Sequence, residues 1–125
     1  MILDTNALSA VADGDAALEP LLQRPLKLFV PVIVLGEYRY GIWQSRERKH
    51  YEQWLTESLP DYKILDVDED TTIFYASVRA EIKKAGTPIP SNDVWIAALC
   101  RQHGLPLLSR DRHFDSVSGV RRIAW

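Results

Sequence analysis

The chain is poor in the features that mark secreted and membrane proteins. Its single cysteine, Cys100, excludes an intramolecular disulfide and a multi-cysteine zinc site, and a lone thiol suits a reducing compartment. No apolar run approaches the ~20 residues that cross a bilayer. The first residues lack the basic and apolar regions of a signal peptide. We therefore expect a cytoplasmic protein that does not enter a membrane.

Net charge is also small, with 15 Lys and Arg against 17 Asp and Glu. A hydrophobic content of 46% is too high for a disordered chain. The 125 residues predict one domain over 1–125, large enough to bury about two-thirds of its unfolded surface. Slight acidity would disfavour nucleic acid as a partner, but net charge says nothing about how the charges are distributed.

Short apolar runs alternate with longer segments of helical periodicity. We expect strands at residues 2–3, 28–30, 64–65, 105–108 and 123–125, and helices over 6–12, 15–23, 32–43, 46–58, 69–85 and 92–103. Ser91 or Asn92 is expected to cap the last helix. This alternation predicts a parallel sheet with right-handed crossovers. The fold class is α/β, a three-layer sandwich of a short parallel sheet with helices on both faces.

Four acidic residues lie where such a sheet would bind a ligand, near the carboxyl ends of its strands. Asp4 follows the first strand, Asp111 follows the strand near residue 108, Asp93 opens a helix, and Glu37 lies inside one. Three of them also have structural interpretations. Asp4 could cap a helix; Asp93 could complement a helix dipole; and Asp111 could belong to a surface ion pair.

Glu37 is harder to explain structurally. Its helix, 32–43, is apolar nearly all round, which predicts burial. A buried carboxylate is costly without a counter-charge, and Arg39 points to another side of the helix. A cation held by other acids would supply that charge. Gly36 and Gly41 lower helix propensity and predict close packing on this helix.

Convergence of the four acids would require a cation. Two carboxylates 4 Å apart repel by about 4 kcal/mol at an effective dielectric of about 20. Carboxylate oxygens and water are the ligands of Mg²⁺ or Mn²⁺, whereas zinc recruits histidine or cysteine. Such an ion activates water and neutralises charge on a phosphoryl group. The chemistry that this arrangement suits is phosphodiester hydrolysis.

Four motifs in order resemble those of the PIN domain, specifically the toxin ribonucleases of VapBC toxin–antitoxin pairs. They are Leu3-Asp4-Thr5-Asn6, Leu35-Gly36-Glu37, the segment Pro90-Ser91-Asn92-Asp93-Val94-Trp95-Ile96-Ala97-Ala98, and Leu108-Ser109-Arg110-Asp111-Arg112-His113-Phe114. The resemblance runs from about residue 2 to 125. Each motif alone is weak, but four in register with an α/β pattern form a strong signal.

The resemblance implies a metal-dependent endoribonuclease. Its acids would be Asp4, Glu37, Asp93 and Asp111, which would bind Mg²⁺ or Mn²⁺ directly or through water, with Asp4 and Asp93 as direct ligands. The resemblance also implies a homodimer, and a small antitoxin whose C-terminal tail crosses and blocks the acidic site.

Other residues near the motifs have supporting interpretations. Thr5 and Ser109 fall where the family places hydroxyl groups that hydrogen-bond the acids, and Asn6 would help similarly or cap the first helix. Asp115 could join the site as a peripheral acid, although a surface position is favoured. His113 is expected to order the loop after Asp111 rather than to act as a base.

Basic residues indicate where RNA would bind. Residues 99–125 contain five arginines and two aspartates, and Arg110 and Arg112, which flank Asp111, are the preferred phosphate contacts.

A second basic group lies near aromatic residues and could follow an RNA backbone while the aromatics stack on bases. Its members are Arg46, Arg48 and Lys49, near Trp43, Tyr51 and Trp54. The alternative, which is favoured, is a solvated helix face with Trp54 in the core.

Two other function classes start from the same acids. A Mg²⁺-dependent phosphatase or receiver domain also begins with a strand and an aspartate. Such a phosphatase needs a second Asp two residues later, where this chain has Asn6. A receiver needs a lysine at the end of a late strand, and no lysine ends the strand at 105–108. A non-catalytic binding module would use the acids as helix caps and would hold them apart.

Overall fold

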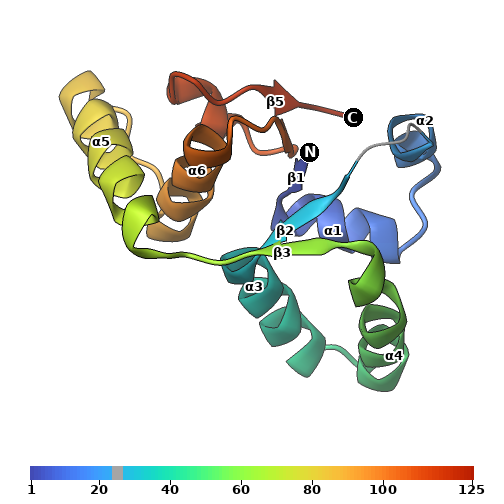
Figure 1. Cartoon of the computed structure of the whole chain (residues 1–125). Helices are drawn as coiled ribbons and strands as arrows, with labels where there is room; N and C mark the ends of the chain where they lie inside the picture. The colour runs from blue at the N-terminus through green and yellow to red at the C-terminus, as the bar shows by residue number, and fades with distance from the viewer. Residues whose placement is uncertain (24–26) are drawn as a thin grey trace.

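A five-stranded parallel sheet forms the centre of the molecule. The computed structural model describes residues 1–23 and 27–125. The strands are β1 (Ile2–Leu3), β2 (Phe29–Pro31), β3 (Lys63–Leu65), β4 (Leu107–Leu108) and β5 (Arg122–Ile123), in the order β3-β2-β1-β4-β5. All described pairings are parallel. The predicted α/β class is therefore confirmed (Figure 1).

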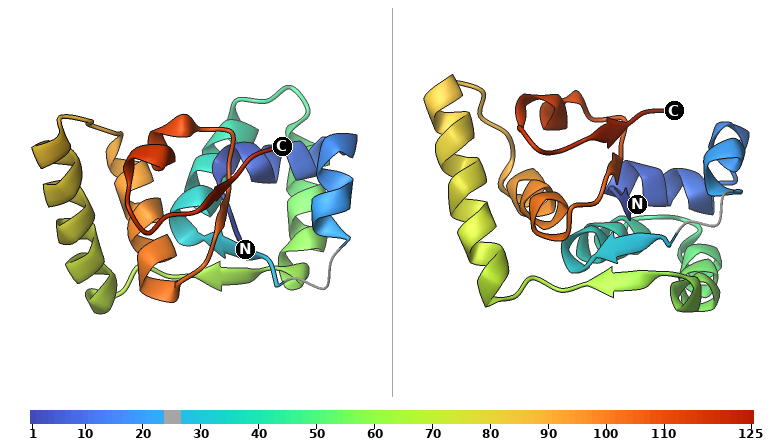
Figure 2. Two further views of the ribbon diagram at one scale, coloured as in Figure 1. Left: turned by 90° about the horizontal axis from the view of Figure 1, so that it is seen from above. Right: turned by 45° about the horizontal axis from the view of Figure 1, so that its top comes forward.

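Helices cover the sheet on both sides, in three layers. The α-helices are α1 (Thr5–Ala12), α2 (Glu19–Leu22), α3 (Val32–Trp43), α4 (Arg48–Ser58), α5 (Glu69–Ala85) and α6 (Ser91–His103). Short 3₁₀ turns are η1 (Ala16–Leu18), η2 (Leu59–Asp61) and η3 (Arg112–Ser116). Figures 1 and 2 show α5 and α6 together on one side of the strands and α1 and α4 on the other. Within the described ranges no helix is long and apolar enough to cross a membrane.

The strand order brings the ends of β1 and β4 together. From β1 the chain continues to β2 and β3 on one side of β1, whereas β4 and β5 lie on its other side. The strand order therefore reverses between β1 and β4. Ligands of α/β proteins bind at such a switch point. The backbone N–H of Asp4 donates to Leu108 O over 3.1 Å, and that of Ser109 donates to Ile123 O over 3.0 Å. The residues that follow β1 and β4 therefore share one edge.

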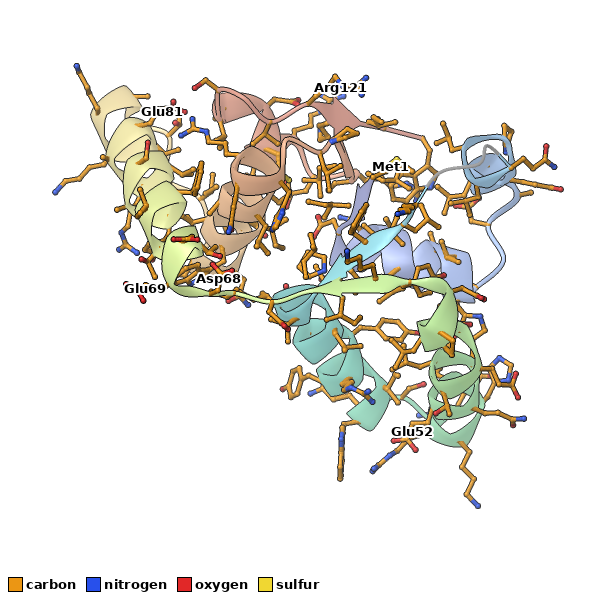
Figure 3. The ribbon with its side chains drawn as sticks, in the orientation of Figure 1. Met1, Glu52, Asp68, Glu69, Glu81 and Arg121 are labelled. Atoms are coloured by element: carbon orange, nitrogen blue, oxygen red, sulfur yellow. The ribbon has the colours of Figure 1, made fainter. Side chains whose placement is uncertain are left out.

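The ends of α5 and α6 follow from the residues at their caps, although the predicted cap of α6 is wrong. The range of α5 agrees with the prediction: Asp68, labelled in Figure 3, forms a reciprocal capping box with Thr71, and Gly86 ends the helix at φ 69°. The expected cap of α6 by Ser91 or Asn92 is wrong. Both lie inside the helix, and Pro90 occupies the cap position without a side-chain hydrogen bond, because a proline fits an extended residue before a helix.

The helix predicted over 15–23 is broken into η1 and α2. Pro20 lies in the first turn of α2 and has no backbone N–H, so it cannot continue a helix that begins several residues earlier. Asp15 caps η1 through a hydrogen bond from the Ala17 backbone N–H. The segment is therefore two short turns instead of one helix.

The expectation that α3 is buried all round is wrong. Only Val34, Tyr38 and Ile42 are buried, whereas Tyr40 and Trp43 are 65% and 66% exposed. Helix α3 packs against α1 and α4 on one side, and its outer side faces solvent. An apolar sequence therefore produced a helix with one buried face.

The two glycines of α3 do not mark close packing within this chain. A Cβ atom added at Gly36 or Gly41 would meet nothing within 4 Å. The prediction of backbone approach on α3 is therefore wrong, because the helix surface at both positions is open.

The core beneath the sheet edge depends on Phe114, which is fully buried within η3. We expect Phe114→Ala to lower the free energy of unfolding by about 3–5 kcal/mol, because it leaves a cavity under the loop after β4. Urea unfolding measures the loss. Ile73→Ala is the control, since Ile73 is 68% exposed, and an equal effect of the two substitutions would contradict the prediction.

Candidate active site

Asp4 occupies the centre of the sheet edge and is only 4% exposed. It caps α1 through Oδ1, which accepts a hydrogen bond from the Thr5 backbone N–H over 2.8 Å. Its other oxygen, Oδ2, accepts from Ser109 Oγ over 2.6 Å and from Asn6 Nδ2 over 3.1 Å. The capping interpretation of Asp4 is therefore correct, and it coexists with a place in the acidic site.

Ser109 is a fully buried hydroxyl that joins the two halves of the edge. Besides donating to Asp4, its Oγ accepts from the Asp111 backbone N–H over 3.0 Å and from Asn6 Nδ2 over 3.3 Å. Asn6 Oδ1 accepts in turn from the Arg110 backbone N–H over 3.1 Å. This network fixes the loop after β4 against the start of α1, and with it the direction of the acids.

Asp93 and Asp111 come together from α6 and from the start of η3. One ligand atom of Asp93, one of Asp111 and one of His113 all lie within 4.8 Å of one another. His113 Nδ1 is 3.0 Å from Asp111 Oδ1 and 3.5 Å from Asp93 Oδ2. Sequence reasoning gave His113 only a loop-ordering role. The available signal was a histidine two residues after Asp111, an aspartate that closely follows a strand.

Glu37 reaches the same region from α3. Its Oε1 accepts a hydrogen bond from Thr5 Oγ1 over 3.3 Å, and its side chain is only partly buried. Burial raises the pKa of Glu37, and the negative charge of Asp4 raises that pKa further, against the hydrogen bond from Thr5. Glu37 and Asp4 are therefore electrostatic neighbours.

The acids lie close enough to perturb one another. Burial raises the pKa of Asp93 to about 6, with further contributions from the charges of Asp4 and Asp111 and a smaller one from Glu37. Burial also raises the pKa of Asp4, despite its hydrogen bonds from Ser109 and Thr5. Carboxylates whose charge is penalised in this way are a donor set that fits a hard divalent cation.

Asp115 lies apart from this cluster of ligand atoms. It forms two hydrogen bonds with Arg122, of 2.8 and 2.9 Å, and this ion pair lowers the pKa of the Asp115 carboxyl. Its negative charge is therefore matched by a neighbouring arginine.

The two arginines beside Asp111 differ in their surroundings. Arg110 pairs with Asp15 over 3.0 Å, and its guanidinium lies over the Trp125 ring at 4.4 Å. Arg112 is exposed, and within the described ranges it has no ion-pair partner. The positive charge available at this rim is that of Arg112.

The second basic group is a surface feature at the α3–α4 corner. The Arg48 guanidinium stacks on Trp43 at 3.4 Å and pairs with Glu52 at 2.9 Å. Trp54 instead packs against the core, edge-on to Tyr38. The interpretation that put Trp54 in the core is confirmed.

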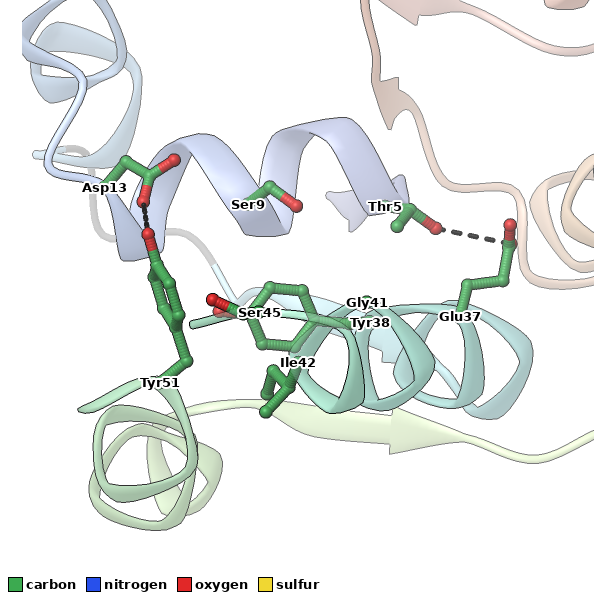
Figure 4. Close-up of a pocket in the computed structure, with 9 residues that line it drawn as sticks. All are labelled: Thr5, Ser9, Asp13, Glu37, Tyr38, Gly41, Ile42, Ser45 and Tyr51. Atoms are coloured by element: carbon green, nitrogen blue, oxygen red, sulfur yellow. Dashed lines mark hydrogen bonds between the residues drawn. The ribbon is translucent and has the colours of Figure 1, made fainter. Parts of the chain in front are cut away.

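A groove of about 280 Å³ leads away from the acidic edge. Figure 4 shows it between α1, α3 and α4, with Thr5 and Glu37 at one end and Asp13 and Tyr51 at the other. The Tyr51 hydroxyl donates to Asp13 Oδ1 over 2.7 Å. Tyr38 also lines the groove, but its hydroxyl oxygen is buried and has no hydrogen-bond partner among the described residues.

Comparison with known proteins identifies the family. The sequence profile of the PIN domain matches residues 1–120. The chain belongs to the PIN domain family. The four motifs with which the sequence resembled that family therefore lie in a genuine PIN domain.

PIN-domain relatives carry names that refer to RNA cleavage. The chain is 31% identical to "Ribonuclease VapC2" of Haemophilus influenzae, covering 99% of this chain and 96% of that protein. It is 26% identical to "tRNA(fMet)-specific endonuclease VapC" of Salmonella typhimurium, over 79% and 76% of the two chains.

A solved structure shares both sequence and fold with this PIN domain. The crystal structure of VapBC-5 from Mycobacterium tuberculosis, a member of the VapBC family of toxin-antitoxin systems, matches with a TM-score of 0.76 and 29% identity. The alignment covers 99% of this chain and 97% of that one.

The raised pKa of Asp93 predicts that Asp93→Asn stabilises the metal-free PIN domain. Because the folded pKa of about 6 exceeds the ordinary 3.8, the wild-type fold loses stability as pH rises through this interval. Asp93→Asn should therefore raise the free energy of unfolding by about 1–3 kcal/mol at pH 7.5 in a chelator, and by less at pH 4.5.

Urea unfolding at the two pH values measures this difference. The exposed Asp70 provides the control substitution, Asp70→Asn. A loss of stability in Asp93→Asn at pH 7.5 would instead mark Asp93 as a structural partner.

Proposed function

We propose that this protein is a Mg²⁺- or Mn²⁺-dependent endoribonuclease that acts as the toxin of a toxin–antitoxin pair. The observation that carries the proposal is the gathering of acids at one edge of a PIN domain, where ligand atoms of Asp93 and Asp111 lie within 4.8 Å of each other and Asp4 and Glu37 are hydrogen-bonded beside them. Relatives named ribonuclease and tRNA-specific endonuclease support RNA as the substrate class.

The proposed reaction is hydrolysis of a phosphodiester. Water adds to phosphorus while one P–O ester bond breaks, which leaves a phosphomonoester end and a hydroxyl end. The bound divalent ion would polarise the phosphoryl oxygen and activate the water. Asp4 and Asp93 would hold the ion directly, and Glu37 and Asp111 would hold it directly or through water. A carboxylate that is free of the ion can accept the proton that the water releases.

Hydroxyl and amide groups orient these carboxylates. Ser109 and Asn6 donate to Asp4 Oδ2, while Thr5 donates to Glu37. Each bond leaves lone pairs of the carboxylate free to face the ion. The three residues therefore act by fixing the direction of the acids, as groups behind metal ligands commonly do.

The alternatives have less support. A phosphatase of the aspartyl type needs an acid at the position of Asn6, whose side chain here donates to Asp4. A binding module with the acids apart disagrees with the mutual pKa effects of Asp4, Asp93 and Glu37.

The proposal includes an antitoxin, a homodimer and a cytoplasmic location, where RNA is available. VapBC-5, with 29% identity, is a member of a toxin–antitoxin family. The groove beside Glu37 supports inhibition by a partner chain. A segment of that partner lying in the groove would reach the acids with one end. The exposed apolar side of α3, with Val32 and Trp43, supports a further protein interface.

Removing a charge from the site should abolish cleavage. We expect Asp4→Asn and Asp93→Asn to remove RNA cleavage by the purified protein in Mg²⁺ or Mn²⁺, because both lose a ligand charge. Circular dichroism should show an intact fold, since Asn retains the capping oxygen of Asp4. Asp70→Asn should cleave normally, and sequencing of RNA ends reports the cut. Full activity in both site variants would refute the metal role.

Arg112 should contribute to RNA binding. For a single-stranded RNA, Arg112→Ala should raise KM and lower the slope of log affinity against log salt by about 0.7, the value for one lost phosphate contact. Arg121→Ala is the matched control. Arg121 is also exposed, but it precedes β5 and so lies at the amino ends of the strands, away from the acids at their carboxyl ends. Equal effects of the two substitutions would count against a phosphate contact at Arg112.

A further inference from the structure

His113 contributes a nitrogen atom to a cluster in which the sequence predicts only carboxylates. Its Nδ1 lies 3.0 Å from Asp111 Oδ1 and 3.5 Å from Asp93 Oδ2. The three ligand atoms fall within 4.8 Å of one another, so one ion could contact all three. Among the described residues, these three have their ligand atoms close enough together to bind one metal ion.

The local fold holds the His113 side chain in this position. Asp111 caps η3, and its Oδ1 accepts a hydrogen bond from the His113 backbone N–H over 2.9 Å. The next residue, Phe114, is fully buried and anchors the turn. With the backbone fixed on both sides, the imidazole projects toward the first turn of α6, where Asp93 lies.

A nitrogen donor changes which cation the site prefers. Mg²⁺ strongly favours oxygen ligands. Mn²⁺ takes the same carboxylate ligands as Mg²⁺ but, as a transition-metal ion, also accepts an imidazole nitrogen, so a site of carboxylates with one histidine separates these two ions. We infer that His113 is a ligand of the divalent ion through Nδ1, beside Asp93 and Asp111, and that it makes the site selective for Mn²⁺ over Mg²⁺. This inference rests on the metal-dependent function proposed above and specifies its cation.

The competing explanation is that His113 acts only as a counter-charge for the two aspartates. The two explanations predict opposite results. Removal of a ligand weakens Mn²⁺ binding selectively, whereas removal of a positive charge leaves the affinity for both ions unchanged or raises both together.

Mn²⁺ bound to the full chain can be tested directly by pulsed electron paramagnetic resonance. Electron spin echo modulation should show a coupled imidazole nitrogen in the wild-type protein and no such nitrogen in His113→Ala. His103→Ala is the matched control, because His103 is exposed at the opposite end of α6 from Asp93. It should keep the nitrogen signal.

Affinities provide the second measurement. His113→Ala should weaken Mn²⁺ binding by about tenfold, while Mg²⁺ binding, measured by competition with Mn²⁺, changes little. His113→Gln, which offers an amide oxygen, should lose the imidazole signal and still bind Mg²⁺. Because His113 is exposed at its side chain, these variants should fold normally.

The outcomes separate this inference from the proposed function. Mn²⁺ binding without an imidazole signal, a signal that survives His113→Ala, or equal changes for both ions would overturn the role of His113 alone. Absence of Mn²⁺ and Mg²⁺ binding to the wild-type protein would overturn both the inference and the metal-dependent function.

Discussion

Carboxylates withdrawn from water at one edge of the sheet repel one another, and the hydrogen bonds around them hold them there against that repulsion. Burial and mutual charge raise the pKa of Asp4, Glu37 and Asp93. Donors from Ser109, Asn6 and Thr5 oppose this effect without neutralising the charge. A divalent cation relieves the same repulsion, so the destabilisation of the metal-free edge becomes affinity for the ion.

The strand order explains why so few residues suffice to build this edge. Strands of two or three residues end where β1 and β4 lie side by side, and the polar side chains follow at once. Asp4 serves both as the cap of α1 and as a member of the acidic cluster, since its two oxygens have different partners. Structural and functional interpretations of one residue are therefore compatible, because a carboxylate has enough lone pairs for both.

Sequence reasoning worked where the rule was local or topological. The bounds of α5 follow from its periodicity and from the glycine that ends it, and Asp4 and Asp111 were expected at one edge because they follow parallel strands. It failed where distant contacts decide. The pairing of Arg110 with Asp15 joins residues 95 positions apart. The solvent exposure of α3 depends on what packs beside it, and the direction of the His113 side chain depends on the buried Phe114 next to it.

The bond between Ser109 and Asp4 spans 105 positions of the chain. Since a ribosome synthesises the polypeptide from its N-terminus, Asp4 is made long before the Ser109 hydroxyl that donates a hydrogen bond to it. Asp111 arrives later still. A nascent chain thus lacks a complete acidic edge until the segment that carries Ser109 and Asp111 has left the exit tunnel, so the order of synthesis delays assembly of the proposed nuclease site.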